Sequence, residues 1–340
     1  MLKRNRTDGI GAAVLPRRGL LLSALALFLS PRAARSAQGV HFFRIGAGPS
    51  GGTWFPAAGW IATAISNPPG SRPCEKNGRC GVPGLIAMAQ TTDGGAANIE
   101  ALRAGGVEAA LAYADMAHDA GRGRGAFKSR GPFAGLRAVA MLAPECLHLV
   151  VGRESAIPSV SGLKGRRIAV AAGAEGLAEI LLKRQGFGGR QIRGLTLPPE
   201  AAAAAFAAGR ADAVVCMARP GSRLLHQIVS EAGGVLLAPG ESVLAEMMRR
   251  NPFLVVTGLA VPGGKGTVES VALTPVLLVR ESLDDALVEQ MSRALWLAAR
   301  ADDGNSPLDA QSFAPAQISR RGVPLHPAAQ RFRDQLNLTD

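Results

Sequence analysis

Strand-like and helix-like patterns alternate along the chain. Short apolar runs have the pattern of buried strands, and longer segments repeat apolar residues at helical spacing. This alternation predicts an α/β architecture with mostly parallel sheets, because parallel strands are joined by crossover helices. The predicted strands are 42–46, 85–90, 109–112, 137–142, 147–151, 167–171, 212–216, 253–257 and 273–279. The predicted helices are 54–66, 96–104, 115–121, 176–186, 199–208, 221–231, 241–249, 284–300 and 327–336.

The N-terminal region has the order of an export signal. Its apolar run of 11 residues, 19–29, is too short to span a bilayer core of about 30 Å. Basic residues precede this run and small residues follow it, so we predict a signal peptide over 1–36 that is cleaved near 36–37. The pair Arg17-Arg18 resembles a twin-arginine signal, although general secretory signals also carry such pairs. We therefore expect a periplasmic protein.

The basic charge of the chain does not indicate a nucleic-acid partner. The formal net charge is +12, but residues 1–36 hold seven basic residues and one acid, which leaves +6 for the rest. The remaining basic residues are scattered, as on a solvated surface. Aromatic residues make up only 4% of the chain, too few for base-stacking platforms. We expect a monomer that binds no nucleic acid.

The cysteines fit an exported protein. Cys74 and Cys80 enclose the short loop "CEKNGRC" between prolines, so we predict a disulfide between them in an oxidising compartment. No histidine or acid stands near them at ligand spacing, and we predict neither a metal site nor a cofactor. For Cys146 and Cys216 two possibilities remain, buried free thiols or a second bridge.

The glycine-rich loop "GPSGGTW" (48–54) lies between the first predicted strand and helix. It lacks the glycine spacing of a dinucleotide site, but 48–52 match the G-x-S-x-G pattern of a serine hydrolase, with Ser50 as nucleophile. In a serine hydrolase this turn, the nucleophile elbow, also needs a histidine and an acid near the serine, and it usually follows a later, central strand. The candidate histidines are His41, His118, His148, His226 and His326.

A binding role for the same loop is the stronger hypothesis. Gly51 and Gly52 permit unusual backbone angles and close approach of a ligand. Thr53 can cap the following helix and also offer its hydroxyl, and Trp54 can form a pocket wall. In the alternative, Thr53 is only a cap and Trp54 only part of the core.

A second loop with similar properties is "TTDGGAANIEAL" (91–102). Thr92 and Asn98 can donate hydrogen bonds to a carboxylate, and in the equally favoured alternative Asn98 is only a helix-start residue. Tyr113 ends a predicted strand, where side chains point toward a cleft, or else it is buried in the core. Asp115 is predicted to be the N-cap of the next helix, or less often a partner for a ligand amine.

The second half of the chain repeats this organisation in "KGRRIAVAAGAEGLAEILL" (164–182), where a strand again ends at glycines before a helix. Two such units facing each other across a hinge would form a cleft that favours anions. Glu175 opposes this, unless it points outward or binds a ligand cation. Arg219 can grip a carboxylate in two places, or it pairs with Glu175 or is solvated.

Six segments stand in a recognisable order. They are "IGAGPSGGTWFPAAGWIATAI", "TTDGGAANIEALRAGGVEAALAYADMAHDA", "LRAVAMLAPECLHLVVGRESAIPSVSGLKGRRIAV", "AAGRADAVVCMARPGSRLL", "TPVLLVRESLDDALVEQMSRALW" and "VPLHPAAQRFRDQL". In this order they resemble the TAXI-type solute-binding proteins of tripartite ATP-independent periplasmic (TRAP) transporters, over roughly residues 41–336. The chain departs from that family at "AAGAEGLAE" (171–179), where the usual serine and threonine hydroxyls are missing.

The resemblance implies a two-lobed fold of the periplasmic-binding-protein type II class. Lobe I would comprise 41–142 plus 272–340 and lobe II 143–271, with hinge segments near 137–150 and 258–280. The implied function is capture of a small anionic or zwitterionic solute, a carboxylate or an amino-acid-like molecule, and its delivery to TRAP membrane permease subunits. Glu175 puts a dicarboxylate in doubt. The alternatives are a ligand-sensing receptor for a signalling partner and, less favoured, a serine hydrolase using Ser50.

Overall fold

The protein is described from a computed structural model. The structure describes residues 39–73, 80–183, 185–188, 190, 195–262, 266–301, 306–308, 310–313 and 322–336. The predicted signal peptide, 1–36, and Cys74 lie outside these residues, so export and the disulfide to Cys80 stay predictions. All features below belong to the unit Val40–Asp340. Within the described residues, no helix has both the length and the apolar character to cross a membrane.

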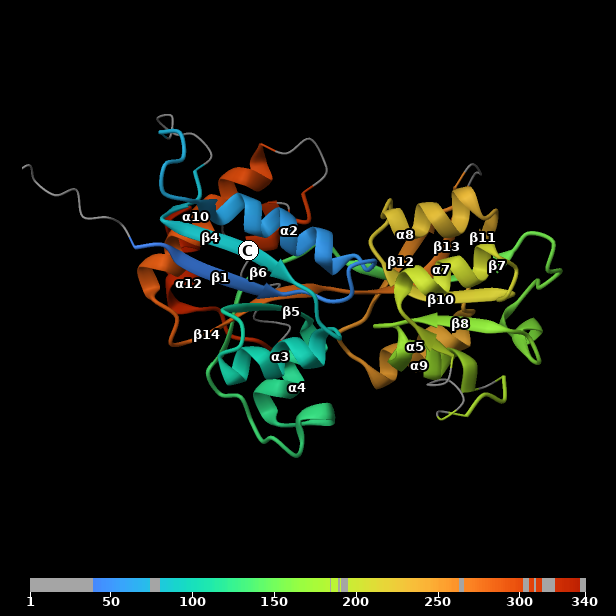
Figure 1. The fold of residues 1–340 in the computed structure, drawn as a ribbon. Helices are drawn as coiled ribbons and strands as arrows, with labels where there is room; N and C mark the ends of the chain where they lie inside the picture. Colours follow the sequence, from blue (N-terminus) through green and yellow to red (C-terminus); the bar gives the residue numbers. More distant parts are fainter. Residues whose placement is uncertain are drawn as a thin grey trace, which may run out of the picture. The chain divides into compact units, whose positions relative to one another are not determined.

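The first sheet has five strands, with helices on both faces (Figure 1). Its strands in spatial order are β4 (Leu85–Gln90), β1 (His41–Gly46), β5 (Ala109–Tyr113), β14 (Pro275–Arg280) and β6 (Leu136–Met141). One face is covered by α2 (Trp54–Ile65), α10 (Asp285–Arg300) and α12 (Pro327–Gln335). The other is covered by α3 (Gly95–Ala104) and α4 (Ala114–Arg122). Short elements β2 (Ser66–Asn67), β3 (Val82–Pro83) and η1 (Gly125–Phe127) flank this layer.

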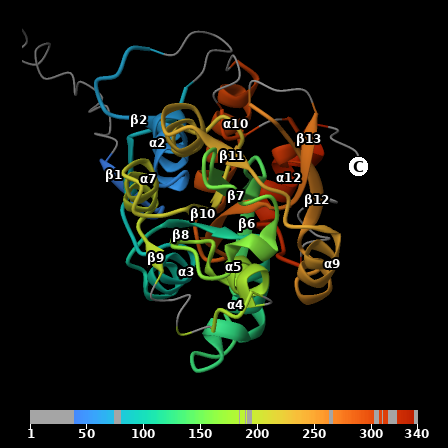
Figure 2. The same cartoon turned by 90° about the vertical axis from the view of Figure 1, so that its right-hand side faces the viewer.

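The second sheet has seven strands and is likewise covered on both faces. Its spatial order is β12 (Val255–Ala260), β13 (Thr267–Leu273), β7 (Glu145–Gly152), β10 (Ala213–Ala218), β8 (Ile168–Ala171) and β9 (Thr196–Leu197), and β11 (Gly234–Leu236) also pairs with β7. Figure 2 shows β12 and β13 at one end of this sheet and β9 at the other. One face carries α7 (Pro199–Ala207), α8 (Arg223–Leu225) and the π-helix His226–Glu231. The opposite face carries α5 (Glu175–Lys183) and α9 (Glu241–Arg250).

Helical spacing of apolar residues holds α2 against the first sheet. Ala58, Ile61, Ala62 and Ile65 are its buried residues, and they belong to one core cluster with Phe43 of β1. Residues three or four apart lie on one side of a helix, so the opposite side of α2 is left for solvent. This packing fixes the first turn of α2, and therefore the glycine-rich loop before it, at the end of β1.

The prediction of mostly parallel sheets is wrong. In the first sheet β1 is parallel to β4 and β5, whereas β14 is antiparallel to β5 and β6. In the second sheet only the pairs β8–β9 and β8–β10 are parallel, and the other pairs are antiparallel. One cause is the two crossings between the sheets, because a strand that arrives from the other sheet runs opposite to the βαβ strands. Another is the direct connection of the consecutive strands β12 and β13, which pair antiparallel.

Both crossings are short and fall within 137–150 and 258–280. The chain passes from β6 to β7 through residues 142–144, and from β13 to β14 through Thr274 alone. The strand predicted at 273–279 is β14, except that Leu273 ends β13, a strand of the other sheet that the sequence did not predict. The strand predicted at 253–257 is displaced to β12, and the helix predicted at 221–231 is divided into α8 and the π-helix. Cys146 and Cys216 are buried free thiols, which excludes a bridge between them.

A buried histidine in β7 makes stability depend on pH. His148 is 2% exposed and its Nδ1–H donates to the carbonyl of Cys146 at 2.8 Å. Burial lowers its pKa from 6.5 to about 4, with the hydrogen bond to Cys146 opposing the shift. The unfolded chain then binds more protons between these values, so this stability is present above pH 6.5 and is lost as pH falls toward 4.

We expect the free energy of unfolding to fall by about 2 kcal/mol from this histidine between pH 7 and pH 5. Urea unfolding of wild type and His148→Leu at both pH values measures it, because groups common to both proteins cancel in the difference. His226→Leu, a change at an exposed histidine, is the matched control. Equal pH dependence of His148→Leu and wild type would contradict this prediction.

Candidate functional site

Loops from both sheets enclose a cavity of about 440 Å³, which we call the strand-end cavity. The loops follow β1, β4 and β5 of the first sheet and β8 of the second, and Met217 from the end of β10 also lines the cavity. Ligands of open α/β sheets bind at the carboxyl ends of parallel strands. The strand-end cavity occupies that position for both sheets.

The lining of the strand-end cavity is acidic. Asp93, Asp115, Glu145 and Glu175 line it, and Arg250 is the one basic residue of its described lining. The Arg250 guanidinium also donates to Glu246 at 2.6 Å, which partly neutralises it. Apolar walls come from side chains of both sheets: Trp54, Met116, Leu177, Ile180, Met217 and Leu273. A lining of this kind suits a small polar solute that carries a cationic group.

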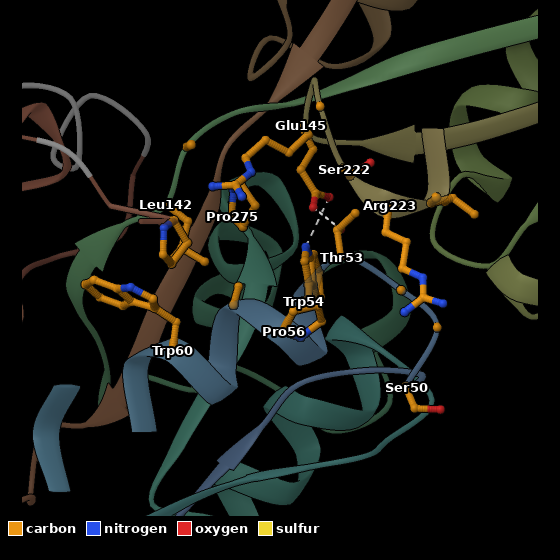
Figure 3. Close-up of a pocket in the computed structure, with 18 of the residues that line it drawn as sticks. Ser50, Thr53, Trp54, Pro56, Trp60, Leu142, Glu145, Ser222, Arg223 and Pro275 are labelled. Carbon is orange, nitrogen blue, oxygen red and sulfur yellow. Dashed lines mark hydrogen bonds between the residues drawn. The ribbon is translucent and has the colours of Figure 1, made fainter. Parts of the chain in front are cut away.

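Glu145 lies at the centre of the site and accepts three side-chain hydrogen bonds. Its Oε1 accepts from the Thr53 hydroxyl, and its Oε2 accepts from Trp54 Nε1 at 3.1 Å and from the Tyr113 hydroxyl at 2.5 Å. Figure 3 shows the first two of these contacts. Glu145 is 4% exposed, and burial raises its pKa, while the three hydrogen bonds and the charge of Arg219 act in the opposite direction.

The predicted donors Thr53, Trp54 and Tyr113 are therefore brought together, but around a carboxylate of the protein. Thr53 occupies the N-cap position of α2 without a side-chain capping bond, so the predicted capping role is wrong, because its hydroxyl donates to Glu145. The rings of Trp54 and Tyr113 meet edge to face, with centroids 4.8 Å apart. Burial and the charge of Glu145 raise the pKa of Tyr113 well above its usual value.

Sequence reasoning missed Glu145. A signal was present, because Glu145 is the only Asp, Glu, Lys or Arg between Arg137 and Arg153, in a segment predicted to cross between the lobes. A charged residue inside such an apolar segment needs partners when it is buried. Those partners come from the β1–α2 loop and from the end of β5, which no local pattern connects to it.

A second cavity of about 690 Å³, which we call the Trp60 cavity, also borders this cluster. Thr53, Trp54 and Glu145 line both cavities. Figure 3 shows Trp60 of α2 on one side of the Trp60 cavity and Arg223 and Ser50 on the other. Ser50 is exposed in a turn.

Arg219 and Glu175 lie in different cavities. Arg219 lines the Trp60 cavity, and its Nη1 donates to the carbonyl of Ser306 at 2.9 Å. Glu175 lines the strand-end cavity, where it begins α5 and its Oε2 accepts from the backbone N–H of Gly173 at 2.8 Å. Of the two alternatives given for Glu175, pointing outward or binding a cationic group of the ligand, its place in the cavity lining fits the second.

Gly51 and Gly52 serve close packing in this structure. Neither is among the glycines with positive φ in the described residues, so the predicted need for unusual backbone angles is wrong. A Cβ at Gly51 would lie 2.1 Å from Glu200 Oε2 and 2.8 Å from Glu200 Cβ. Gly52 donates its N–H to Pro49 at 3.0 Å, so this group is used within the turn. The loop is thus small because α7 approaches it.

Thr92 and Asn98 form a structural network. Asn98 is fully buried, and its Nδ2 donates to the carbonyls of Ala47 at 2.6 Å and Leu111 at 2.7 Å. The Thr92 hydroxyl donates to Asn98 Oδ1 at 2.6 Å. The described lining of either cavity includes neither residue, so we do not propose them as solute contacts.

Asp115 is not the N-cap of α4, which begins at Ala114 with Tyr113 as its N-cap. Its carboxylate accepts from the N–H of Met116 at 2.7 Å and from Asn251 Nδ2 at 2.5 Å. Asn251 belongs to the segment after α9, so this contact joins the two sheet regions beside the strand-end cavity. Burial raises the pKa of Asp115, against the effect of these hydrogen bonds.

Comparison with known proteins supports this architecture. The model of the NMT1-like family matches residues 45–333. A solved structure described as a periplasmic transporter is 13% identical over 88% of this chain and 98% of that one, with a TM-score of 0.50. This similarity confirms the two-sheet α/β fold of the periplasmic-binding-protein type II class. Two alkanesulfonate- or sulphonate-binding SsuA proteins also match. The one from Xanthomonas axonopodis pv. citri, bound to MOPS, is 19% identical over 87% of this chain and 84% of that one, with a TM-score of 0.44. The one from Escherichia coli is 17% identical over 86% and 83%, with a TM-score of 0.43.

Proposed function

The chain belongs to the NMT1-like family, and we propose that it is an exported receptor that captures a small solute and delivers it to a membrane permease. The observation that carries this proposal is the strand-end cavity, where loops of both sheets meet at strand ends. Only residues 142–144 and Thr274 connect the sheets at the crossings, so lobes built on them can separate to admit a solute and close around it.

We place the solute among small zwitterions of amino-acid type. Its amine would lie near Asp93, Asp115 and Glu175, and its carboxylate would lie toward Arg250. A dicarboxylate would bring two negative charges into a lining with four acids and one base, and it is therefore disfavoured.

The partner that we propose is a TRAP permease, on the strength of the six ordered segments. Transport in vesicles containing the permease tests this part. Uptake driven by an ion gradient supports a TRAP partner, whereas uptake that requires ATP hydrolysis identifies an ATP-driven importer.

A thermal-shift screen of amino acids, amines and carboxylates tests the capture function. A ligand at 100 times its Kd adds about 2.7 kcal/mol to the free energy of unfolding, which is readily detected. We expect the largest shifts from compounds that contain an amine, with calorimetry giving one site per chain. A screen in which no compound of these classes shifts the transition would contradict the proposal.

Ser50→Ala is expected to leave the affinity for the best solute of this screen within about tenfold of wild type, because Ser50 is exposed and at most forms one modest hydrogen bond. Both deeply buried histidines have structural contacts, His148 inside β7 and His326 at the start of α12. Loss of ester hydrolysis in Ser50→Ala, from a wild type that hydrolyses the same ester, would instead support the hydrolase and contradict solute capture.

A further inference from the structure

The three donors around Glu145 form the kind of arrangement that binds a carboxylate of a solute. A hydroxyl, an indole N–H and a phenol converge on two oxygen atoms. An ionised carboxylate is a pure acceptor, so it satisfies all three at once. In this chain Glu145 supplies that carboxylate from the first position of β7, directly after the crossing from the first sheet.

The position of Glu145 gives its charge an effect on both cavities. Its side chain is 4% exposed, yet it contributes to the lining of the strand-end cavity and of the Trp60 cavity. A charge in such a poorly solvated place acts more strongly on its surroundings than one in water. In the strand-end cavity it adds to three other acids, whereas the Trp60 cavity holds Arg219 and Arg223 beside Glu200.

The aromatic pair lines the same cavity, but its polar hydrogens are already used. Trp54 and Tyr113 both line the strand-end cavity and both donate to Glu145. Their polar hydrogens are directed at that carboxylate, so neither hydrogen is available to a carboxylate of a solute. The pair therefore offers a second negative group no hydrogen bond while Glu145 is in place.

We propose that Glu145 determines the charge of the solute: it occupies the three donors in place of a solute carboxylate and makes the strand-end cavity select an ammonium or other cationic group. This inference rests on the proposed function. The sign of the selectivity then depends on one residue, Glu145, which was not among the residues predicted to contact the solute.

Three solutes with the same four-carbon chain test the selectivity: succinate, 4-aminobutyrate and 1,4-diaminobutane. Calorimetry on wild type is expected to rank the diamine or the amino acid above succinate. Glu145→Gln keeps the size of the side chain and removes its charge. It is expected to shift the ratio of the succinate and diamine affinities toward succinate by at least about tenfold, which is 1.4 kcal/mol. Glu154→Gln, at an exposed acid on a turn, is the control for net charge.

A second measurement needs no solute. Iodide and caesium quench tryptophan fluorescence by collision, and their ratio reports the sign of the charge near the ring. In a Trp60→Phe background the half-buried Trp54 dominates the quenching, because Trp296 is 7% exposed. At constant ionic strength, Glu145→Gln is expected to raise quenching by iodide relative to caesium about twofold, and Glu154→Gln to leave the ratio unchanged.

The two measurements separate the possible failures. An unchanged quenching ratio in folded Glu145→Gln overturns the inference, and so does an unchanged solute ratio where binding is measurable. If none of the three solutes binds wild type while the quenching ratio shifts as expected, the charge role of Glu145 is supported and the proposed solute class fails. Circular dichroism and the thermal transition establish that each variant is folded.

Discussion

Replacing Asn98 with leucine is expected to lower the free energy of unfolding by about 3 to 5 kcal/mol. Asn98 is fully buried and its amide joins two neighbouring strands, through the carbonyls of Ala47, directly after β1, and of Leu111, in the middle of β5. Leucine has a similar volume, so it leaves little cavity. It removes three hydrogen bonds and leaves two carbonyls and the Thr92 hydroxyl with a lost partner, each at a penalty of about 1 to 3 kcal/mol.

Urea unfolding of the two proteins measures this difference. Thr92→Val is the matched control, because it removes only the two outer hydrogen bonds of the network, the one that the Thr92 hydroxyl donates to Asn98 and the one that it accepts from the N–H of Gly94 at 3.3 Å, and it is expected to lower the free energy by about 1 to 2 kcal/mol. Thr92→Val also tests the earlier hypothesis that Thr92 contacts the solute. We expect this variant to bind the solute with the affinity of the wild type. A loss of less than 1 kcal/mol in Asn98→Leu would show that water or a backbone shift replaces the amide.

Helices were the most predictable part of the fold, because local signals define them. The helix predicted at 284–300 is α10, whose N-cap, Asp284, accepts from the N–H of Leu287 at 2.8 Å. Edge strands were harder to predict. β12 is exposed at four of its six positions, and two of these are the apolar Val255 and Val256, so apolar residues do not mark which of its positions are buried or where it ends. The apolar strand predicted at 273–279 is buried, but hydrophobicity does not reveal that the chain passes from one sheet to the other at Thr274.

The candidate site was predictable only in part. Glycines and strand ends indicated loops that line the strand-end cavity, and Gly52, Thr53, Trp54, Tyr113 and Glu175 are all among its lining residues. The direction of each side chain was not predictable. Thr53 and Trp54 meet Glu145 across more than 90 positions of sequence, and Tyr113 meets it across 32, so only the tertiary fold brings them together. For the same reason Thr92 and Asn98 were predicted to donate to a solute carboxylate, whereas in the structure the Thr92 hydroxyl donates to Asn98.

Gly51→Val is expected to weaken solute binding about 100-fold, which is 2.7 kcal/mol. Gly51 lies in the loop before α2, and Glu200 near the start of α7 lies against it. The Glu200 carboxylate can rotate away from a new side chain. Its Cβ cannot, since it would lie 2.8 Å from the Cβ at position 51, closer than such atoms approach. The valine therefore has to push α7 away from the loop.

That displacement widens the strand-end cavity, because Gly52 in the loop and Pro199 at the start of α7 both line this cavity. Gly51 has no positive φ, so valine adds no backbone strain, and the displacement of α7 is expected to lower the free energy of unfolding by about 1 to 3 kcal/mol. The second variant, Gly51→Val with Glu200→Gly, removes the opposing side chain and is expected to recover most of the affinity. Calorimetry with the best solute of the screen compares the three proteins. Wild-type affinity in Gly51→Val would show that solute binding does not depend on the packing of α7 against the loop. An equal loss of affinity in the single and the double variant would show that the loop itself binds the solute.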